Sequence, residues 1–427
     1  MRLTTILLLT LLTATACDRS PERAPGAQAS PATARAAMYT RSDWPLPVTA
    51  TAAQPDLIRA PDGTLLLSWI EPQGEGHALR FARYTGRAWG EVQEIARGSD
   101  WFVNWADTPH LVATADGALW AHWLKKSANA QYAYDVALSR SGDGGVTWSE
   151  PMLVNDDGTP TEHGFVSMWP AARDRIGIAW LDGRRSGGEE AEGRGGHAGH
   201  EGPSAMTLRA ATFDAALRRD GDRELDAMTC DCCQTDTALT TRGPLLVYRD
   251  RTPEEIRDIA ATRYDGATWT PAHVVHADRW KMPACPVNGP AVAAEGNQAV
   301  VAWYTVAADQ PTLRIARSND AGDTFATPIT LDQGARVQGR VDVTLDADDA
   351  WVLWTLEDGG SQSLQFARYT PDLSRELQRG EVARLQGRGR ATGFAQVATG
   401  NDGTYVVWTD VVDGKPRLAG ARYGVAP

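Results

Sequence analysis

Residues that could perform acid–base or nucleophilic chemistry stand beside short apolar runs of the sequence. Asp107 and Glu162 supply a pair of carboxylates, and His163 follows Glu162 directly. Tyr134 and Tyr248 supply hydroxyl groups, which become nucleophilic when a neighbouring carboxylate accepts the proton. These five residues are candidates for bond hydrolysis, and turn capping or pairing between strands is the alternative use of the same side chains.

Five further polar residues are candidates for holding a ligand. An arginine guanidinium binds a carboxylate through two parallel N–H groups, which fixes the orientation of the ligand. We expect the arginines to converge on an acidic ligand or a glycan, with the other polar side chains beside them. The ligand-binding candidates are Arg184, Arg249, Arg340, Asp250 and Asn288.

Four cysteines form a third group of candidates: Cys230, Cys232, Cys233 and, further along the chain, Cys285. We expect one or two disulfides between them, and a bridge that closes a loop of this length stabilises a fold by about 2–4 kcal/mol. A thiolate site for copper or zinc, with His163 or another histidine nearby, is the alternative. The spacing matches no standard zinc motif, and no other metal or cofactor is expected.

The elements that must position these residues are given by a repeat. Seven short β-type runs that end in an aromatic residue recur along the chain, and a repeating unit of roughly 55 residues with about four strands is typical of a propeller blade. The sequence therefore predicts an all-β fold, a seven-bladed β-propeller, with a six-bladed propeller as the alternative. The runs are 64–69, 119–123, 176–180, 245–248, 299–303, 350–354 and 405–408.

The ends of the repeat predict how the ring of blades closes. The seventh unit stops at Tyr423, which leaves no room for its outermost strand. We expect the segment Trp44–Ala50 to pair there and remove an exposed sheet edge. Loops that lead into the inner strands, and loops between the second and third strands, should share one face, where the candidate residues would meet.

Two hairpins carry a tighter pattern, Ser141–Trp148 and Ser318–Phe325, which read Ser-x-Asp-x-Gly-x-Thr followed by Trp or Phe. This pattern resembles the Asp box of the sialidase superfamily. The resemblance implies a propeller whose Asp boxes lie away from the site. It also implies an Asp acid/base, a Tyr nucleophile assisted by Glu, and three arginines. Asp107, Tyr134 or Tyr248, and Glu162 match those roles by residue type, whereas the Phe-Arg-Ile-Pro motif of the first arginine is missing.

The N-terminus predicts export. An apolar run from Leu3 to Leu12 follows Met1-Arg2, and small residues precede Cys17, which resembles the bacterial lipobox whose cysteine is lipidated. A plain secretory signal is the alternative. We expect a lipoprotein signal peptide at 1–16, a flexible tether at 17–42 and the propeller at 43–427.

Charge and composition limit the partners. The net charge of −12 over 427 residues gives no extended positive field for a phosphate backbone, so no nucleic acid partner is expected. The sequence therefore predicts an exported propeller, anchored to a bacterial membrane through its lipid alone and facing the periplasm. We expect it to bind a glycan or acidic ligand at an axial cleft and, if it is an enzyme, to act as an exo-α-sialidase-like hydrolase. A non-catalytic propeller that binds an envelope protein, and a metal-binding or redox accessory protein, are the alternatives.

Overall fold

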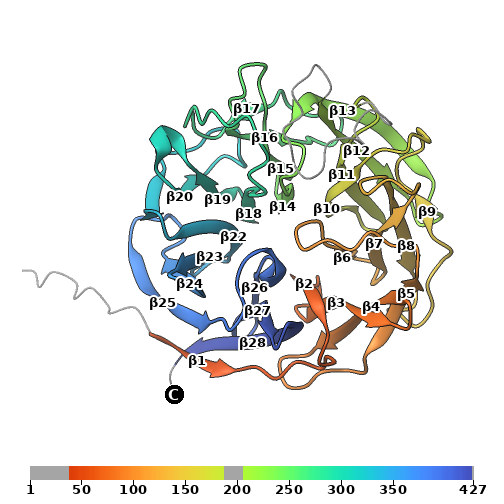
Figure 1. Ribbon diagram of the computed structural model, residues 1–427, viewed down its shortest axis with the longest axis horizontal. Helices are drawn as coiled ribbons and strands as arrows, with labels where there is room; N and C mark the ends of the chain where they lie inside the picture. Colours follow the sequence, from red (N-terminus) through yellow and green to blue (C-terminus); the bar gives the residue numbers. More distant parts are fainter. Residues whose placement is uncertain (1–37, 187–204, 426–427) are drawn as a thin grey trace, which may run out of the picture. The chain divides into compact units, whose positions relative to one another are not determined.

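The computed structural model describes residues 38–186 and 205–425, and these residues form seven four-stranded antiparallel sheets arranged around a central axis (Figure 1). The predicted all-β propeller with seven blades is therefore confirmed, and the six-bladed alternative is wrong. Among these residues, two short 3-10 turns, Ala307–Asp309 and Arg390–Thr392, lie in connections between strands. Among the described residues, no helix is long and apolar enough to cross a membrane.

The strands of each blade run from the axis outward in chain order. In blades one to three they are β2 (Ala53–Arg59), β3 (Leu65–Gln73), β4 (Gly76–Tyr84), β5 (Gln93–Gly98); β6 (Leu111–Ala113), β7 (Leu119–Lys126), β8 (Tyr134–Ser141), β9 (Met152–Leu153); and β10 (His163–Ala172), β11 (Arg175–Asp182), β12 (Met206–Phe213), β13 (Arg219–Thr229).

The same order holds in blades four to seven, except that the last strand of blade seven is the first strand of the chain. These strands are β14 (Asp236–Thr240), β15 (Gly243–Arg249), β16 (Ile259–Arg263), β17 (His273–Val274); β18 (Ala291–Glu295), β19 (Gln298–Thr305), β20 (Thr312–Ser318), β21 (Ile329–Gln333); β22 (Val337–Leu345), β23 (Ala350–Asp358), β24 (Ser361–Tyr369), β25 (Glu376–Arg384); and β26 (Gln396–Gly400), β27 (Gly403–Val412), β28 (Lys415–Val425), β1 (Tyr39–Asp43).

The aromatic residues of the repeat pack between blades. Trp180 is fully buried, and Trp303 and Trp354 are 1% exposed. Their indole N–H groups donate to carboxylates, as in the hydrogen bonds from Trp303 to Asp278 at 2.7 Å and from Trp354 to Asp332 at 2.9 Å. Trp303 and Trp354 thus satisfy their one polar group against the outer part of the preceding blade, whereas Trp180 donates to Asp182 of its own strand at 2.8 Å. Each of these three buried indoles has a carboxylate partner.

The ring closes one segment earlier in the chain than the sequence predicted. β1 pairs with β28 from Tyr39 opposite Val425 to Asp43 opposite Ala421, so Trp44–Ala50 is not the closing strand. Proline has no N–H to donate to a sheet, and Pro45 and Pro47 break that segment. The folded part therefore includes residues 39–42, which the sequence assigned to the tether.

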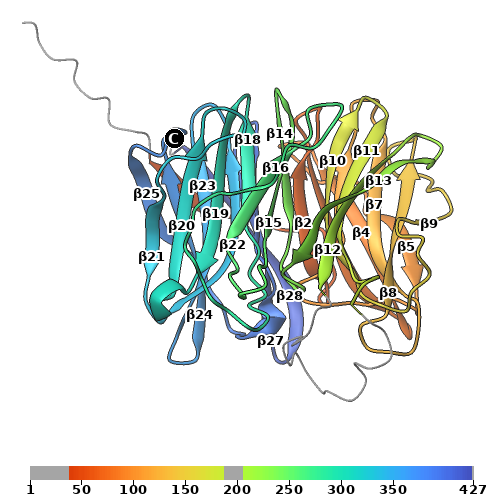
Figure 2. The same cartoon turned by 90° about the horizontal axis from the view of Figure 1, so that it is seen from above.

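The propeller has two faces, seen edge-on in Figure 2. The site face carries the loops that lead into the inner strands and the loops between the second and third strands. The turn face carries the other connections, including the hairpins 141–148 and 318–325. Because Tyr39 pairs with Val425, β1 begins on the turn face, where β28 ends.

The hairpins 141–148 and 318–325 have the same hydrogen bonds. In the first hairpin the Ser141 hydroxyl donates to Asp143 Oδ1 at 2.7 Å, and Asp143 accepts from the N–H and hydroxyl of Thr147 at 2.9 and 2.6 Å. The second hairpin repeats the three bonds with Ser318, Asp320 and Thr324 in those positions. Each turn is thus closed by the aspartate at the third position of its motif, Asp143 in the first and Asp320 in the second.

Candidate functional site

Three of the residues singled out in the sequence meet at the site face. Tyr134 begins β8, and Glu162 precedes β10 of the next blade, to which Tyr134 forms an isolated parallel bridge. The Tyr134 hydroxyl lies 2.6 Å from Glu162 Oε1 and 3.2 Å from Asp107 Oδ2. We call Asp107, Tyr134 and Glu162 the tyrosine cluster.

The tyrosine cluster requires a glycine beside it. A Cβ atom added to Gly164 would lie 2.0 Å from Asp107 Oδ2 and 2.9 Å from Tyr134 Cε2. The next residue, Phe165, has a φ of 49°, and its N–H donates to Asp107 Oδ1 at 2.8 Å. The backbone at the start of β10 thus passes against the carboxylate, and no pattern in the sequence predicts this close approach.

Asp107 also belongs to a structural series. Asp56, Asp236 and Asp342 each accept a backbone N–H from the inner strand of the following blade, at 2.7, 2.6 and 2.6 Å. Asp107 does the same with one oxygen through Phe165. Its other oxygen faces the Tyr134 hydroxyl, so Asp107 adds a contact to the tyrosine cluster on top of its role between blades.

The charges of the tyrosine cluster are shifted by burial. Desolvation raises the pKa of Glu162 to about 8 and the pKa of Asp107 to about 7, with the mutual repulsion of the carboxylates contributing for Glu162. Burial and the two carboxylates raise the pKa of Tyr134 well above its ordinary value. Since the tyrosine hydroxyl has one proton and two carboxyl partners, one of these acids must be protonated to donate to it. The cluster therefore holds an exchangeable proton near neutral pH.

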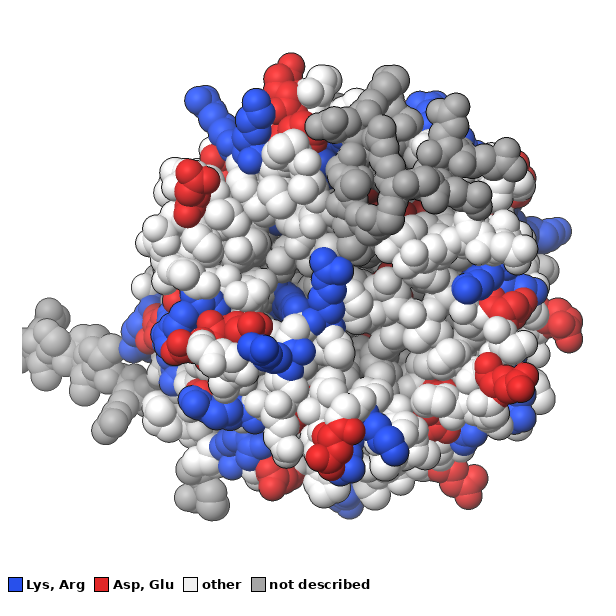
Figure 3. Space-filling model, in the orientation of Figure 1, with Lys and Arg blue, Asp and Glu red and all other residues white. Residues whose placement is uncertain are grey.

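Aromatic side chains surround the tyrosine cluster. Phe102 stacks on Tyr134 with ring centroids 4.1 Å apart and an interplanar angle of 9°. Trp105, two residues before Asp107, stacks on Phe394 with ring centroids 5.8 Å apart. The exposed Arg390 lies with its guanidinium carbon 5.9 Å from the Trp105 ring centroid. Lys and Arg side chains stand near the centre of this face (Figure 3).

The structure does not bring the three candidate arginines together as free ligand-binding groups. Arg249 is 2% exposed, and its guanidinium donates to three backbone carbonyls, those of Asn288, Arg257 and Tyr304, at 2.6 to 2.9 Å. Burial lowers its pKa to about 9. Arg340 donates to Thr392 Oγ1 at 2.8 Å and lies 5.0 Å from the Trp105 ring centroid. The predicted arginine cluster is therefore replaced by separate structural contacts.

The other ligand-binding candidates are also engaged within the protein. Arg184 forms a bidentate pair with Asp182, at 2.7 and 2.8 Å. Asn288 accepts the Arg340 N–H at 2.8 Å, and Asp250 accepts the N–H of Arg251 at 2.7 Å. Sequence reasoning placed these groups on the correct loops but could not tell that Arg184 would pair with the Asp182 side chain and that backbone N–H groups would bond to Asn288 and Asp250.

Tyr248 is not part of the tyrosine cluster. Its hydroxyl donates to Asp226 Oδ2 at 2.6 Å, in the outer strand of the preceding blade. Tyr248 thus takes the place in blade four that Trp303 takes in blade five, where the side chain also donates to a carboxylate of the preceding blade. The repeat, rather than chemistry, accounts for this tyrosine.

His163 points away from Glu162, since adjacent residues on a strand project to opposite sides. Its side chain is fully buried, and its Nδ1 lies 3.1 Å from the Tyr134 carbonyl oxygen. Nε2 lies 3.1 Å from Asp157 Oδ1. His163 therefore does not pair with Glu162 as an acid/base couple.

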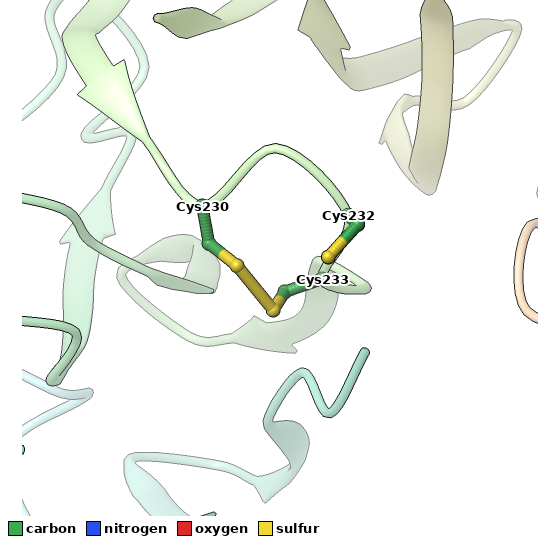
Figure 4. Close-up of side chains that lie close together, drawn as sticks. All are labelled: Cys230, Cys232 and Cys233. Carbon is green, nitrogen blue, oxygen red and sulfur yellow. A yellow bond between two sulfur atoms is a disulfide. The ribbon is translucent and has the colours of Figure 1, made fainter. Parts of the chain in front are cut away.

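The four cysteines form two disulfides at the loops that lead into blades four and five. Cys230 is bonded to Cys233, and Cys232 to Cys285, with Cα atoms 5.8 and 6.0 Å apart. The cysteines pack in one apolar cluster with Trp105 and Phe394. The sulfur atoms of Cys230, Cys232 and Cys233 lie close together (Figure 4). In this state they offer no thiolate to copper or zinc.

Some residues of the site face escaped the sequence analysis. Gln234 bridges the axis, donating to the Ala106 carbonyl at 2.8 Å and accepting the Gly289 N–H at 2.9 Å. Asp157 is the second, and its only sequence signal is its position shortly before Glu162. Cys17 and the predicted signal peptide lie outside the described residues, as do residues 187–204.

Neither a scan against protein-family models nor a search of curated proteins finds a match. Solved structures similar to this chain include an α-L-arabinanase of Penicillium chrysogenum, with 12% identity, a TM-score of 0.45, and coverage of 91% of this chain and 98% of that chain. The endosialidase of phage phi92 has 10% identity, a TM-score of 0.49, and coverage of 92% and 70%. A sialidase of Trypanosoma rangeli with the inhibitor DANA has 13% identity, a TM-score of 0.44, and coverage of 78% and 56%.

The class of the protein is defined by its own seven sheets. The chain is a seven-bladed β-propeller. Within that class it is distinguished by the tyrosine cluster on the site face and by the two disulfides beside it.

Proposed function

We propose that this protein binds a glycan on the site face and hydrolyses a glycosidic bond at the tyrosine cluster. One observation carries the proposal, the contact of the Tyr134 hydroxyl with two carboxyl groups whose pKa values are raised to about 7 and about 8. Acids and bases are most effective when their pKa lies near the working pH. Trp105 and Phe394 supply an apolar platform of the kind on which a sugar ring packs.

In the proposed reaction, ionised Asp107, the carboxyl group with the lower pKa, takes the proton of Tyr134 while the tyrosine oxygen attacks the anomeric carbon. Protonated Glu162 donates its proton to the departing glycosidic oxygen. Water then cleaves the tyrosyl–sugar bond, returning a proton to Glu162 and the phenolic proton from Asp107 to Tyr134. Tyr134 is fully buried and Glu162 is half-buried, so the ligand must move the Glu162 side chain to reach the nucleophile.

The test is a panel of fluorogenic glycosides, including a sialoside, with the mature chain carrying Tyr134→Phe. We expect this variant to lose on the order of 10³-fold or more in kcat, because the nucleophile is removed without changing the packing. Tyr248→Phe is the matched control, since it removes an equally short tyrosine–carboxylate bond that involves no residue of the tyrosine cluster. Its kcat should stay at the wild-type value.

The outcomes separate the alternatives. No turnover of any glycoside by the wild-type chain would contradict hydrolysis, and retention on a glycan array would then leave a glycan-binding propeller. A chain that neither cleaves nor retains glycans would favour the protein-binding propeller of the cell envelope.

We also propose that the chain is exported and anchored through a lipid on Cys17, on the sequence pattern around that residue. Cys17→Ala should move the protein from the membrane fraction to the soluble fraction of the producing cell. A wild-type chain found only in the soluble fraction would contradict the anchor.

A further inference from the structure

Both ring nitrogens of the buried His163 lie near oxygen atoms that can only accept a hydrogen bond, whereas a neutral imidazole has one N–H donor. His163 has no exposed surface, and its Nδ1 lies 3.1 Å from the Tyr134 carbonyl oxygen, an acceptor only. Nδ1 must therefore carry a proton and donate it. That leaves Nε2 with a lone pair unless the ring takes a second proton.

The surroundings of Nε2 are carboxylate oxygens. Asp157 Oδ1 lies at 3.1 Å and Asp182 Oδ1 at 3.8 Å, and Nε2 makes no hydrogen bond with either. A lone pair aimed at two anionic oxygens in a buried place is unfavourable. A cation between these three atoms would remove the conflict.

We propose that Asp157, His163 and Asp182 form a binding site for one divalent transition-metal ion of the zinc class. Their donor atoms all lie within 4.8 Å of one another, and the two aspartates as well as the histidine are largely or fully buried. One imidazole and two carboxylates suit zinc and its neighbours, whereas magnesium and calcium prefer oxygen ligands alone.

Neighbouring groups hold these ligands in place, as the outer partners of metal ligands do. The Trp180 indole N–H donates to Asp182 Oδ2 at 2.8 Å, and the Asn155 amide donates to Asp157 Oδ1 at 3.3 Å. The backbone carbonyl of Tyr134 fixes the His163 ring through Nδ1. All three ligands are thus oriented before an ion arrives.

Arg184 is the competitor for this site. Its guanidinium pairs with Asp182 at 2.7 Å and lies 3.8 Å from Asp157. A third carboxylate, Asp222, lies 3.9 Å from the Arg184 guanidinium, so this arginine faces three acids. Asp135 lies 3.5 Å from His163 Nδ1. The Arg184 side chain is 21% exposed and can turn outward, which would open the Asp182 oxygen to an ion.

The inference does not depend on the proposed hydrolysis, because no ligand of the ion belongs to the tyrosine cluster. The two sites are nevertheless adjacent. His163 follows Glu162 in the chain and bonds to the Tyr134 carbonyl, so an ion would stiffen the strand ends that carry the nucleophile and its partner.

The test is calorimetric titration of the oxidised mature chain, freed of metal and free thiols, with zinc chloride. Wild type should bind one equivalent. Asp157→Asn and His163→Gln should weaken binding by at least about tenfold, the range reported for lost metal-site partners. Arg184→Met should tighten binding by about tenfold, because it removes the competing cation, and a damaged fold cannot mimic that gain.

Cobalt identifies the ligands. Co²⁺ bound at this site should show weak visible bands without the intense near-ultraviolet band of thiolate coordination. No zinc uptake by either wild type or Arg184→Met would overturn the proposal, as would equal affinity in all variants. A thiolate band would assign the metal to the cysteines instead. Two protonated ring nitrogens on His163 in nitrogen NMR, unchanged by zinc, would show that a second proton resolves the conflict.

Discussion

Gly164 lies beside the tyrosine cluster with no room for a side chain. Any side chain there would collide with Asp107 Oδ2, and the hydrogen bond from the Phe165 N–H to Oδ1 of the same carboxylate limits how far that carboxylate can withdraw. We expect Gly164→Ala to lower the free energy of unfolding by about 2–4 kcal/mol, as overpacking in a buried site does. Chemical denaturation measures this change.

Gly221→Ala is the control for this substitution. Gly221 lies in β13, the outer strand of blade three, where an added Cβ meets nothing within 4 Å, although its φ of 65° carries a strain cost. Its loss should be about 1 kcal/mol. Equal losses in the two variants would show that backbone strain, rather than contact with Asp107, governs Gly164.

At the scale of residues, part of the predicted meeting on the site face is present: three acid–base candidates lie together, whereas the three arginines do not converge. Residue type and loop position suggested that Asp107, Tyr134 and Glu162 act together, and their side chains are in contact. The same reasoning predicted that the arginines bind a ligand, yet the Arg249 guanidinium donates its hydrogen bonds to backbone carbonyls. Loop position follows from the repeat, whereas the partner of a long side chain depends on backbone paths that the pattern does not encode.

At the scale of elements, the two disulfides differ in what they close. Cys232–Cys285 spans 53 residues and joins the loops entering blades four and five, whereas Cys230–Cys233 spans 3. The chain-entropy relation assigns about 4 kcal/mol to the long loop and about 2 kcal/mol to the short one. Cys285→Ser should therefore destabilise the fold about twice as much as Cys230→Ser, measured by denaturant unfolding under oxidising conditions.

A free thiol left by either substitution can exchange with the remaining bridge. The double variants Cys232→Ser with Cys285→Ser, and Cys230→Ser with Cys233→Ser, remove whole bridges and serve as controls. Equal losses in the two double variants would contradict the loop-length argument.

The elements themselves were largely predictable because each blade repeats the same alternation and the same aromatic run. The closing strand was the exception. β1 has only Tyr39 partly buried among five residues, so its sequence carries almost no apolar signal. The apolar segment after it, starting at Trp44, was the more visible candidate, but Trp44 packs against Tyr84 and Tyr405 at the junction of blades seven and one.

At the scale of the whole molecule, buried acids make stability depend on pH. Desolvation raises the pKa of Asp342 to about 8, as it does for Glu162. Between pH 6.5 and 9 the unfolded chain has already released these protons while the folded chain still holds part of them. Stability therefore falls as pH rises through this window, by on the order of 2 kcal/mol for each such group.

Asp342→Asn tests this dependence, because the amide oxygen can still accept the Val397 N–H that Asp342 accepts. The variant should lose less stability than wild type between pH 6.5 and 9 in thermal unfolding. Asp143→Asn is the control, since hydrogen bonds lower the pKa of Asp143 and its titration ends below this window. A wild-type stability that rises across the window would contradict the burial argument.

The chain enters the propeller on one particular face, and this determines where an N-terminal membrane anchor would be attached. β1 begins on the turn face, opposite the tyrosine cluster. A lipid on Cys17, as proposed above, would be joined to the propeller at that face, and the connecting residues could span at most about 70 Å. Such an anchor would not require the site face to lie against the lipid, so long polymeric glycans could reach the tyrosine cluster.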